Sequence, residues 1–314
     1  MYKMQTFSML LLVFGLYVLS ESAYGQSTVG GASEPELLRQ PYQSSATEKE
    51  REYLLYIPAG YHDNQSQLWP VILFLNGGGA RGDGLDDLDY LMRNGPLMEA
   101  WIQKRDLEFI IIGPQLPIFE QQEQRRLGPK PERLESGVPP REPESRPCSG
   151  ASHLCGSIVR TEEADTQPWG ELGPPDGWWK TENDFLAILD EVLRDFRGDP
   201  DRVYLTGLSY GGFGTFYMAA AHPGRWAAVA PIVGTGDPNT ATVLAERNLP
   251  IWMFGGGRDG VVHVGRLYPM AQALEAAGHN SVRFTVHEDM GHDAWKRVYA
   301  GEDLYDWFLS HVRH

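Results

Sequence analysis

The sequence predicts an α/β fold with a mostly parallel central sheet, helices on both faces of the sheet and one long insertion. Short apolar runs without alternation are typical of strands that are buried on both faces of a parallel sheet. Segments with apolar residues at helical spacing lie between these runs, and this alternation indicates βαβ units. With 314 residues, 42% of them hydrophobic, the chain can bury one large core.

The individual elements follow from the same two patterns. Apolar runs predict strands at residues 53–58, 71–75, 109–112, 203–206, 227–233, 251–254 and 282–286. Helical spacing is clearest at residues 184–196, where Phe185, Ile188, Leu189, Val192 and Phe196 would share one face. Further helices are expected at residues 213–221, 268–277 and 294–312.

The N-terminus has the layout of a secretory signal peptide. Lys3 precedes an apolar run at residues 9–19, and a small-x-small pattern follows, which predicts cleavage after Gly25. A membrane anchor is the alternative, but the run has about 11 residues whereas a span needs about 20. We therefore expect residues 1–25 to be a signal peptide, residues 26–47 a polar leader and residues 48–314 one domain. The mature protein would be secreted or periplasmic, without stable membrane association.

Residues 116–176 interrupt the alternation and are interpreted as an insertion or flap within that domain. The segment is rich in Pro, Arg and Glu and has no clear periodicity, which is typical of a lid, a binding loop or disorder. It contains both cysteines of the chain, Cys148 and Cys155, and an exported protein is expected to join so close a pair as a disulfide. A zinc site is the alternative, but with only His153 nearby its ligand set would be incomplete.

The composition also bears on partners and cofactors. With a formal net charge of −15, the chain lacks the basic stripe of nucleic-acid-binding proteins, so no nucleic-acid partner is expected. The sequence offers no metal-ligand set, and its glycine-rich loop at residues 77–79 does not have the GxxxxGK[ST] pattern of a phosphate cradle. We therefore expect neither a metal nor a cofactor.

The strongest functional motif is Gly207-Leu208-Ser209-Tyr210-Gly211, between a predicted strand and a predicted helix. In a nucleophile elbow, the serine occupies a strained strand-to-helix turn, and the flanking glycines let neighbouring backbone pass without a Cβ clash. Ser209 is therefore the expected nucleophile. The amide of Tyr210, at the helix N-terminus, is one expected oxyanion donor, and bare glycine amides at Gly77 and Gly78 are expected to supply the other.

A serine nucleophile needs a histidine base, and the base needs an acid that orients it, in the chain order Ser, Asp, His. Asp259 follows the predicted strand at residues 251–254 among glycines and is the expected acid. Asp237, which follows the preceding strand, is its competitor. His292 follows a glycine on the loop before the last predicted helix, and it is the expected base.

On these motifs the chain resembles the secreted esterase-like "predicted peptidase" group of the α/β-hydrolases. This group is related to polyhydroxybutyrate-depolymerase-like, feruloyl and acetylxylan esterases, and more distantly to prolyl oligopeptidase. The resemblance covers most of residues 50–312 and depends on the segments 73–82, 113–117, 199–212 and 290–295. It implies the α/β-hydrolase fold, and a catalytic triad of Ser209, Asp259 and His292.

The chain departs from the family pattern in three places. Asn76 stands where the family often has histidine, and Gly255-Gly256 stand where it usually has His-Gly before the acid. The family's Pro-Gln-Cys-Pro is Pro-Gln-Leu-Pro here, at residues 114–117, and the long insertion follows it. These departures leave the triad residues in place but bear on the choice of substrate.

The expected activity is that of a secreted serine hydrolase that cleaves carboxylic esters through an acyl-enzyme. Its substrate would be a small-molecule ester or an ester linked to a polysaccharide. A serine peptidase of prolyl oligopeptidase type is the first alternative, which the poorer leaving ability of amides disfavours. A non-enzymatic carbohydrate-binding or scaffold protein is the second, and the complete set of triad residues disfavours it.

Overall fold

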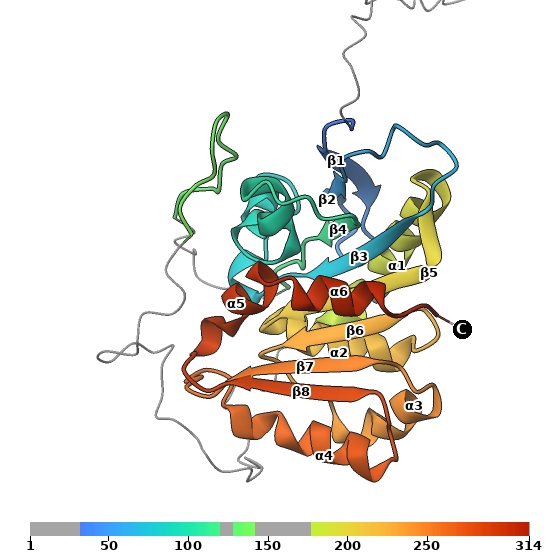
Figure 1. Cartoon of the computed structure of the whole chain (residues 1–314), viewed down its shortest axis with the longest axis vertical. Coiled ribbons are helices and arrows are strands. Elements are labelled where there is room, and N and C mark those ends of the chain that lie inside the picture. The colour runs from blue at the N-terminus through green and yellow to red at the C-terminus, as the bar shows by residue number, and fades with distance from the viewer. Residues whose placement is uncertain (1–31, 120–127, 142–176, 314) are drawn as a thin grey trace, which may run out of the picture. The chain divides into compact units, whose positions relative to one another are not determined.

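The computed structural model describes residues 32–119, 128–141 and 177–313 of the chain (Figure 1). The predicted signal peptide and the cysteine pair, Cys148 and Cys155, lie outside the described residues. In the part of the chain that is described, no helix combines the length and the apolar composition that a membrane span requires.

Eight strands form one sheet in the order β1-β2-β4-β3-β5-β6-β7-β8. The strands are β1 (Glu36–Gln43), β2 (Glu50–Ile57), β3 (Trp69–Leu75), β4 (Ile110–Pro114), β5 (Gly198–Leu208), β6 (Ala228–Ile232), β7 (Ile251–Gly256) and β8 (Val282–His287). The pairs β1–β2 and β2–β4 are antiparallel, and all other neighbours are parallel. This arrangement confirms the predicted α/β class and the mostly parallel sheet, which is that of the α/β-hydrolase fold.

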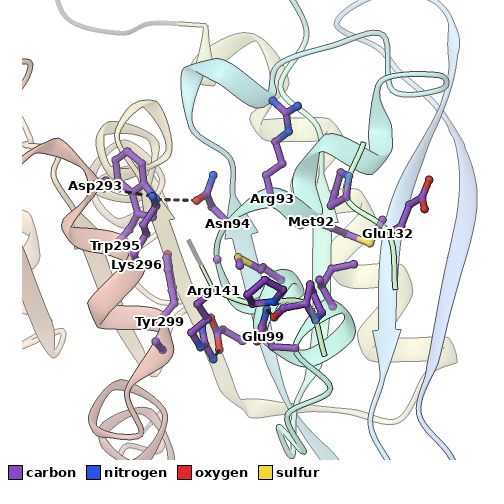
Figure 2. Close-up of a pocket in the computed structure, with 18 of the residues that line it drawn as sticks. Met92, Arg93, Asn94, Glu99, Glu132, Arg141, Asp293, Trp295, Lys296 and Tyr299 are labelled. Carbon is purple, nitrogen blue, oxygen red and sulfur yellow. Dashed lines mark hydrogen bonds and ion pairs between the residues drawn. The ribbon is translucent and has the colours of Figure 1, made fainter. Parts of the chain in front are cut away.

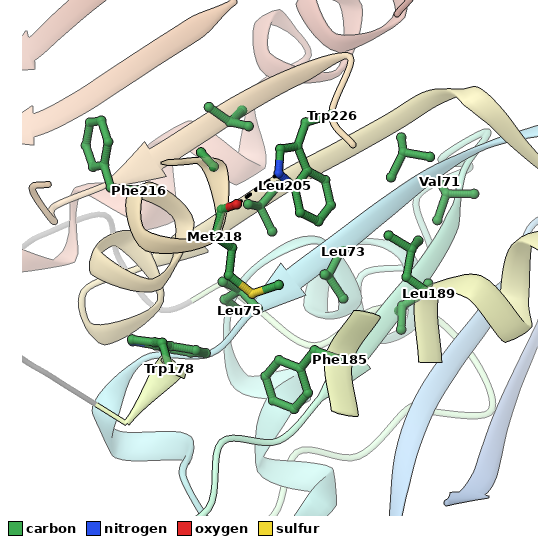
Figure 3. Packing of buried hydrophobic residues seen from close by; sticks show 14 of the residues in the cluster. Val71, Leu73, Leu75, Trp178, Phe185, Leu189, Leu205, Phe216, Met218 and Trp226 are labelled. Atoms are coloured by element: carbon green, nitrogen blue, oxygen red, sulfur yellow. Dashed lines mark hydrogen bonds between the residues drawn. The ribbon is translucent and has the colours of Figure 1, made fainter. Parts of the chain in front are cut away.

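Side chains of the central strands alternate between two hydrophobic cores, one on each face of the sheet. In β3, Val71, Leu73 and Leu75 belong to one core (Figure 3), and Ile72 and Phe74 belong to the other. Because every residue of β3 is buried, its sequence is continuously apolar rather than alternating, as predicted for a strand covered on both sides.

Helices cover both faces. The first core packs against α1 (Trp178–Asp195), α2 (Tyr210–Ala221), α3 (Ala241–Glu246) and α4 (Tyr268–Ala276). The second packs against α5 (Trp295–Ala300), α6 (Asp303–Leu309) and the short helices η2 (Leu88–Arg93) and η3 (Met98–Ile102) of the β3–β4 connection. The expected single helix at residues 294–312 is wrong, because Gly301 adopts an extended conformation and separates α5 from α6.

The expected polar leader at residues 26–47 is wrong for the part of it that the structure describes as β1. This strand pairs with the whole of β2, and Leu37 and Leu38 pack against opposite cores. The turn that follows is bound to α1, where Asp184 accepts hydrogen bonds from the Ser44 hydroxyl (2.6 Å) and the Ser45 N–H (2.8 Å). An edge strand pairs with only one other strand and exposes about half of its side chains, so many of its residues are polar. Its composition therefore resembles that of a polar leader segment.

The edge strand at the other end of the sheet also differs from the prediction. The strand β8 was expected to be buried on both faces, but it is the opposite edge strand and its residues are partly or fully exposed. Of the predicted insertion at residues 116–176, the structure describes only residues 116–119 and 128–141, and none of these belongs to a helix or strand. Residues 120–127 and 142–176 lie outside the description.

Candidate active site

Ser209 lies on the turn between β5 and α2, at the carboxyl edge of the sheet. Its backbone has a φ of 52° and a ψ of −116°, a conformation that is rare for a residue with a side chain. Its N–H donates to the Ile232 carbonyl (2.9 Å), and its own carbonyl accepts from the Gly212 N–H (2.8 Å). Such strain costs about 1–3 kcal/mol and persists only where the surroundings impose it. The neighbouring strand β6 and the first turn of α2 therefore hold the serine in this conformation.

The glycines of the motif are required by close backbone contacts. A Cβ atom on Gly211 would lie 1.9 Å from the carbonyl oxygen of Leu75, and one on Gly207 would lie 2.3 Å from the carbonyl oxygen of Gly211. No side chain fits at either distance. The motif therefore encodes a local packing arrangement that the sequence alone makes recognisable.

His292 bridges Ser209 and Asp259. Its Nε2 lies 3.0 Å from Ser209 Oγ, and its Nδ1 lies 2.8 Å from Asp259 Oδ2. The side chain of Asp259 is 0% exposed, and its Oδ1 accepts hydrogen bonds from the N–H groups of Val261 and Val262, both at 2.8 Å. A carboxylate held in this way favours the imidazole tautomer with its proton on Nδ1, which leaves Nε2 to accept a proton from the serine.

Asp259 and His292 meet because the loops beyond β7 and β8 continue the contact between the two strands. The Gly257 N–H donates to the His287 carbonyl, and the Arg258 N–H donates to the Met290 carbonyl, both at 2.9 Å. These two hydrogen bonds hold Asp259 beside the loop that bears His292.

The loop that bears His292 is also fixed to the helix that follows it. Arg297 of α5 donates to both carboxylate oxygens of Asp289, at 2.8 and 2.7 Å, and these hydrogen bonds lower the pKa of Asp289 to about 2. The ring of Trp295 stands edge-on to the imidazole of His292, with 5.1 Å between the ring centroids. Contacts on two sides therefore restrict where the imidazole can lie.

The predicted oxyanion donors lie against the same turn. Tyr210 is the first residue of α2, so its N–H has no acceptor within the helix. A Cβ atom on Gly77 would lie 2.5 Å from Leu208 Cδ1, and one on Gly78 would lie 2.8 Å from Tyr210 Cδ2. The loop after β3 thus packs directly on Leu208 and Tyr210, the residues that flank Ser209.

Arg81 connects the two sides of this site. Its Nε donates to the Gly78 carbonyl (3.2 Å), and its guanidinium carbon lies 4.5 Å from the centroid of the Tyr210 ring. A cation over an aromatic face is attracted to it. The side chain therefore joins the glycine loop to the start of α2.

The side chains of Asn76 and Gln115 are buried and form hydrogen bonds to the backbone of the glycine loop and its neighbours. The sequence patterns did not identify either residue as functional. Asn76 accepts a hydrogen bond from the Leu116 N–H and donates one to the Gly77 carbonyl, both at 2.9 Å. Gln115 makes three hydrogen bonds of 2.7 to 2.9 Å to the backbone of residues 80–87. The signal that could have identified them is their position, because each is a polar residue directly after a buried strand: Asn76 follows β3 and Gln115 follows β4.

Asp237, the competing acid, does not lie at this site. It is exposed, and its carboxylate accepts hydrogen bonds from the N–H (3.0 Å) and the side-chain amide (2.9 Å) of Asn239, in the short helix η4 (Pro238–Thr240). Within residues 32–119, 128–141 and 177–313, no group of three or more His, Cys, Asp or Glu side chains is arranged to hold a metal ion.

A model of the prolyl oligopeptidase family matches residues 178–246, a stretch that contains Ser209 but neither Asp259 nor His292. A bifunctional acetylxylan esterase/xylanase of Neocallimastix patriciarum is 31% identical over 96 residues, which are 30% of this chain and 13% of that protein. Poly(3-hydroxyalkanoate) depolymerase C of Paucimonas lemoignei is 47% identical over 59 residues, which are 19% and 14% of the two chains. The matched stretches thus span about a fifth or less of these curated relatives.

Among solved structures, a thermostable esterase has a TM-score of 0.59 to this chain at 22% identity. The likeness covers 88% of this chain and 63% of that one. At this identity it concerns the fold alone. The similar proteins, taken together, are serine hydrolases with both esterases and peptidases among them.

Proposed function

We propose that this chain, an α/β-hydrolase, is a serine hydrolase that cleaves carboxylic esters with Ser209 as the nucleophile, His292 as the base and Asp259 as the orienting acid. The observation that carries the proposal is the continuous hydrogen-bond chain from Ser209 Oγ through the imidazole to a fully buried carboxylate. Geometry of this kind defines the triad across unrelated folds, independently of sequence position.

The reaction would proceed in two acyl transfers. Ser209 Oγ attacks the ester carbonyl while His292 Nε2 takes the hydroxyl proton, and the N–H of Tyr210 and the glycine loop stabilise the oxyanion. The carbonyl–alkoxy bond then breaks, and His292 returns the proton to the leaving alcohol. In the second half, His292 deprotonates a water molecule that attacks the acyl-enzyme, and the acid and Ser209 are released.

Support for esters as the substrates comes from two relatives with short matched stretches, which are named as an acetylxylan esterase/xylanase and a poly(3-hydroxyalkanoate) depolymerase. The substrate would be a small-molecule ester or an ester linked to a polysaccharide. A serine peptidase is the second candidate, supported by the match to the prolyl oligopeptidase family over residues 178–246.

Labelling with a fluorophosphonate probe tests the mechanism. We expect wild-type protein to be labelled on Ser209, and Ser209→Ala to lose labelling and at least about 10³-fold in ester turnover, since triad residues act as a unit. Ser66→Ala, at an exposed serine, is the matched control and should leave both unchanged. Absence of labelling in the wild type would point to the non-enzymatic alternative.

A substrate panel separates the two enzymatic candidates. Acetyl, feruloyl and short nitrophenyl esters should be turned over faster than peptides of similar size. A higher kcat/KM for peptides would reverse the assignment in favour of the peptidase.

We also propose that the protein is exported. Residues 1–25 would be removed by a signal peptidase, and Cys148 and Cys155 would form a disulfide in the oxidising compartment. Intact-mass measurement of the exported protein, before and after reduction, tests both. Cleavage after Gly25 lowers the mass by that of residues 1–25, and reduction of the disulfide raises the mass by that of two hydrogen atoms.

A further inference from the structure

Trp295, the first residue of α5, stands between the imidazole of His292 and a cavity of about 620 Å³ (Figure 2). Its ring is nearly perpendicular to the imidazole, at 86°, with 5.1 Å between the ring centroids. The same ring lines the cavity, which lies between α5, η2, η3 and the described part of the insertion, whereas His292 does not line it. The indole is therefore the wall that separates the imidazole from this space.

Asn94 holds the indole in this place. The Trp295 Nε1–H donates to Asn94 Oδ1 at 2.9 Å, as the dashed line in Figure 2 shows. Asn94 directly follows η2 and precedes Gly95, which has a φ of 85° and on which a Cβ atom would lie 2.3 Å from the Phe74 ring. Backbone packing on β3 thus fixes Asn94, and Asn94 ties the indole to a part of the fold that is distant in the chain from His292.

Before the reaction, hydrogen bonds on both nitrogens hold the imidazole. Nδ1 lies 2.8 Å from Asp259 Oδ2, and Nε2 lies 3.0 Å from Ser209 Oγ. Two partners on different sides of a rigid ring leave it little freedom to turn. The contact with Trp295 therefore adds little to the position of the imidazole in this state.

Acylation of Ser209 removes one of these two hydrogen bonds. Once Oγ is bonded to the acyl group, it has no proton to donate to Nε2. The imidazole then retains the hydrogen bond from Nδ1 to Asp259, and a single hydrogen bond leaves the ring free to turn about it. The cavity beyond the indole has room for such a movement, and the Trp295 ring is what closes that side.

We propose that Trp295, held by Asn94, is a positioning residue for the second half of the reaction, the hydrolysis of the acyl-enzyme. The inference rests on the proposed function. In this step Nε2 of His292 takes a proton from water while the water oxygen bonds to the acyl carbon. The bond from that carbon to Ser209 Oγ then breaks, and Oγ takes the proton from Nε2. Trp295 exchanges no atom or proton, and it keeps Nε2 directed at the acyl group until water has attacked.

Steady-state kinetics with 4-nitrophenyl acetate test this role, because nitrophenol leaves in the first half of the reaction and acetate in the second. Trp295→Leu should lower kcat about tenfold, since a misplaced base slows the attack of water. It should leave kcat/KM within a factor of about three, because this ratio reports only the steps up to acylation. KM should therefore fall together with kcat, and a burst of nitrophenol should precede the steady state of the variant.

A loss of stability or of general packing would give a different result. It would lower kcat/KM at least as much as kcat, because acylation needs the same imidazole, and this outcome would overturn the inference. An unchanged kcat would overturn it too. Trp252→Leu is the matched control, because the Trp252 Nε1–H also donates a hydrogen bond of 2.9 Å, to Thr285 Oγ1 on β8. It should change neither kcat nor kcat/KM.

Variants of Asn94 test whether the hydrogen bond to the indole matters. Asn94→Leu removes the acceptor at similar size and should lower kcat about threefold with kcat/KM unchanged, a loss that corresponds to part of one hydrogen bond. Asn94→Asp retains an oxygen acceptor and should keep kcat near that of the wild type. Equal losses in the two variants would overturn the part assigned to this hydrogen bond. If Trp295→Leu does not fold, Asn94→Leu supplies the same readout.

Intact-mass measurement after an acid quench separates failure of this role from failure of the proposed function. During turnover, the acetyl adduct should be present in a larger fraction of Trp295→Leu than of the wild type, and it should be absent from Ser209→Ala. Turnover that survives Ser209→Ala would reject the proposed function and the inference with it. Turnover that depends on Ser209, with no larger acetylated fraction in Trp295→Leu, would retain the esterase and reject the positioning role.

Discussion

The loops that follow β6 and β7 look alike in sequence and differ in what they build. Each leaves a buried parallel strand, passes through glycines and reaches an aspartate, Asp237 after β6 and Asp259 after β7. Asp237 is exposed and its carboxylate binds Asn239, two residues further along its own loop, whereas Asp259 is buried against His292. Equivalent positions along the chain therefore have different surroundings.

The order of the strands explains the difference. β7 lies next to β8, and the loops beyond both strands continue their contact through the Gly257 and Arg258 amides. β6 is separated from β8 by β7, and the Asp237 carboxylate on its loop is bound to Asn239. A carboxylate meets a histidine here because their strands are neighbours, which no local sequence pattern reveals.

We expect the largest effect on kcat when variants at the two aspartates are compared. Asp259→Asn should lower kcat by about 10³–10⁴-fold without unfolding the protein, because the amide cannot fix the imidazole tautomer that accepts the serine proton. Asp237→Asn should leave kcat within a factor of about two, since its carboxylate serves a surface turn. Steady-state kinetics on one ester decides the matter, and a damaging Asp237→Asn would reassign the acid.

Gly256, the last residue of β7, and Gly236, in the loop after β6, differ in the backbone contacts around them. A Cβ on Gly256 would lie 2.1 Å from the Gly291 carbonyl oxygen, next to His292, and one on Gly236 would lie 2.9 Å from the Phe216 side chain. Alanine at either position should lower the free energy of unfolding by about 1–3 kcal/mol through overpacking.

Only Gly256→Ala should also lower kcat/KM, by at least about tenfold, because it displaces the backbone beside the imidazole. Urea unfolding and ester kinetics on both variants supply the two measurements. Equal activities in the two alanine variants would contradict the view that the β7–β8 loop contact positions His292.

The smallest effect concerns Asp289, on the loop after β8. Arg297 lowers the pKa of Asp289 to about 2, below the value of about 3.9 expected in the unfolded chain. The folded state therefore binds this proton less readily, so the contribution to stability is present above about pH 4 and is lost as the pH falls toward 2. The Asp289 side chain is 68% exposed, so the contribution should stay below about 1 kcal/mol.

Urea unfolding of Asp289→Asn at pH 6 and pH 2.5 measures this contribution. The difference from the wild type should be detectable at pH 6 and smaller at pH 2.5. A difference that grows toward acid would contradict the pairing with Arg297.

Several features could be predicted from the sequence because their causes are local. Strands buried on both faces have continuously apolar sequences, and α1 has its apolar residues at helical spacing, so the class of fold and the order of the central elements were predicted correctly. The turn at Ser209 was recognisable because two glycines are required within a few residues of it.

Other features depended on neighbours that are distant in the chain. The strand β1 has the composition of a leader, and its pairing with β2 places it in the sheet. Asn76 and Gln115 act on a loop whose position is known only once β3 and β4 lie side by side.

The class of fold and the serine turn could therefore be read from local sequence patterns, and the same patterns offered the candidate serine, histidine and aspartates. Which carboxylate faces His292, and which residues hold the glycine loop, depended on the tertiary structure. Periodicity and steric clashes between near neighbours depend only on short stretches of chain, so a sequence pattern can reveal them. Contacts across the sheet depend on strand order, which is the outcome of packing the whole domain.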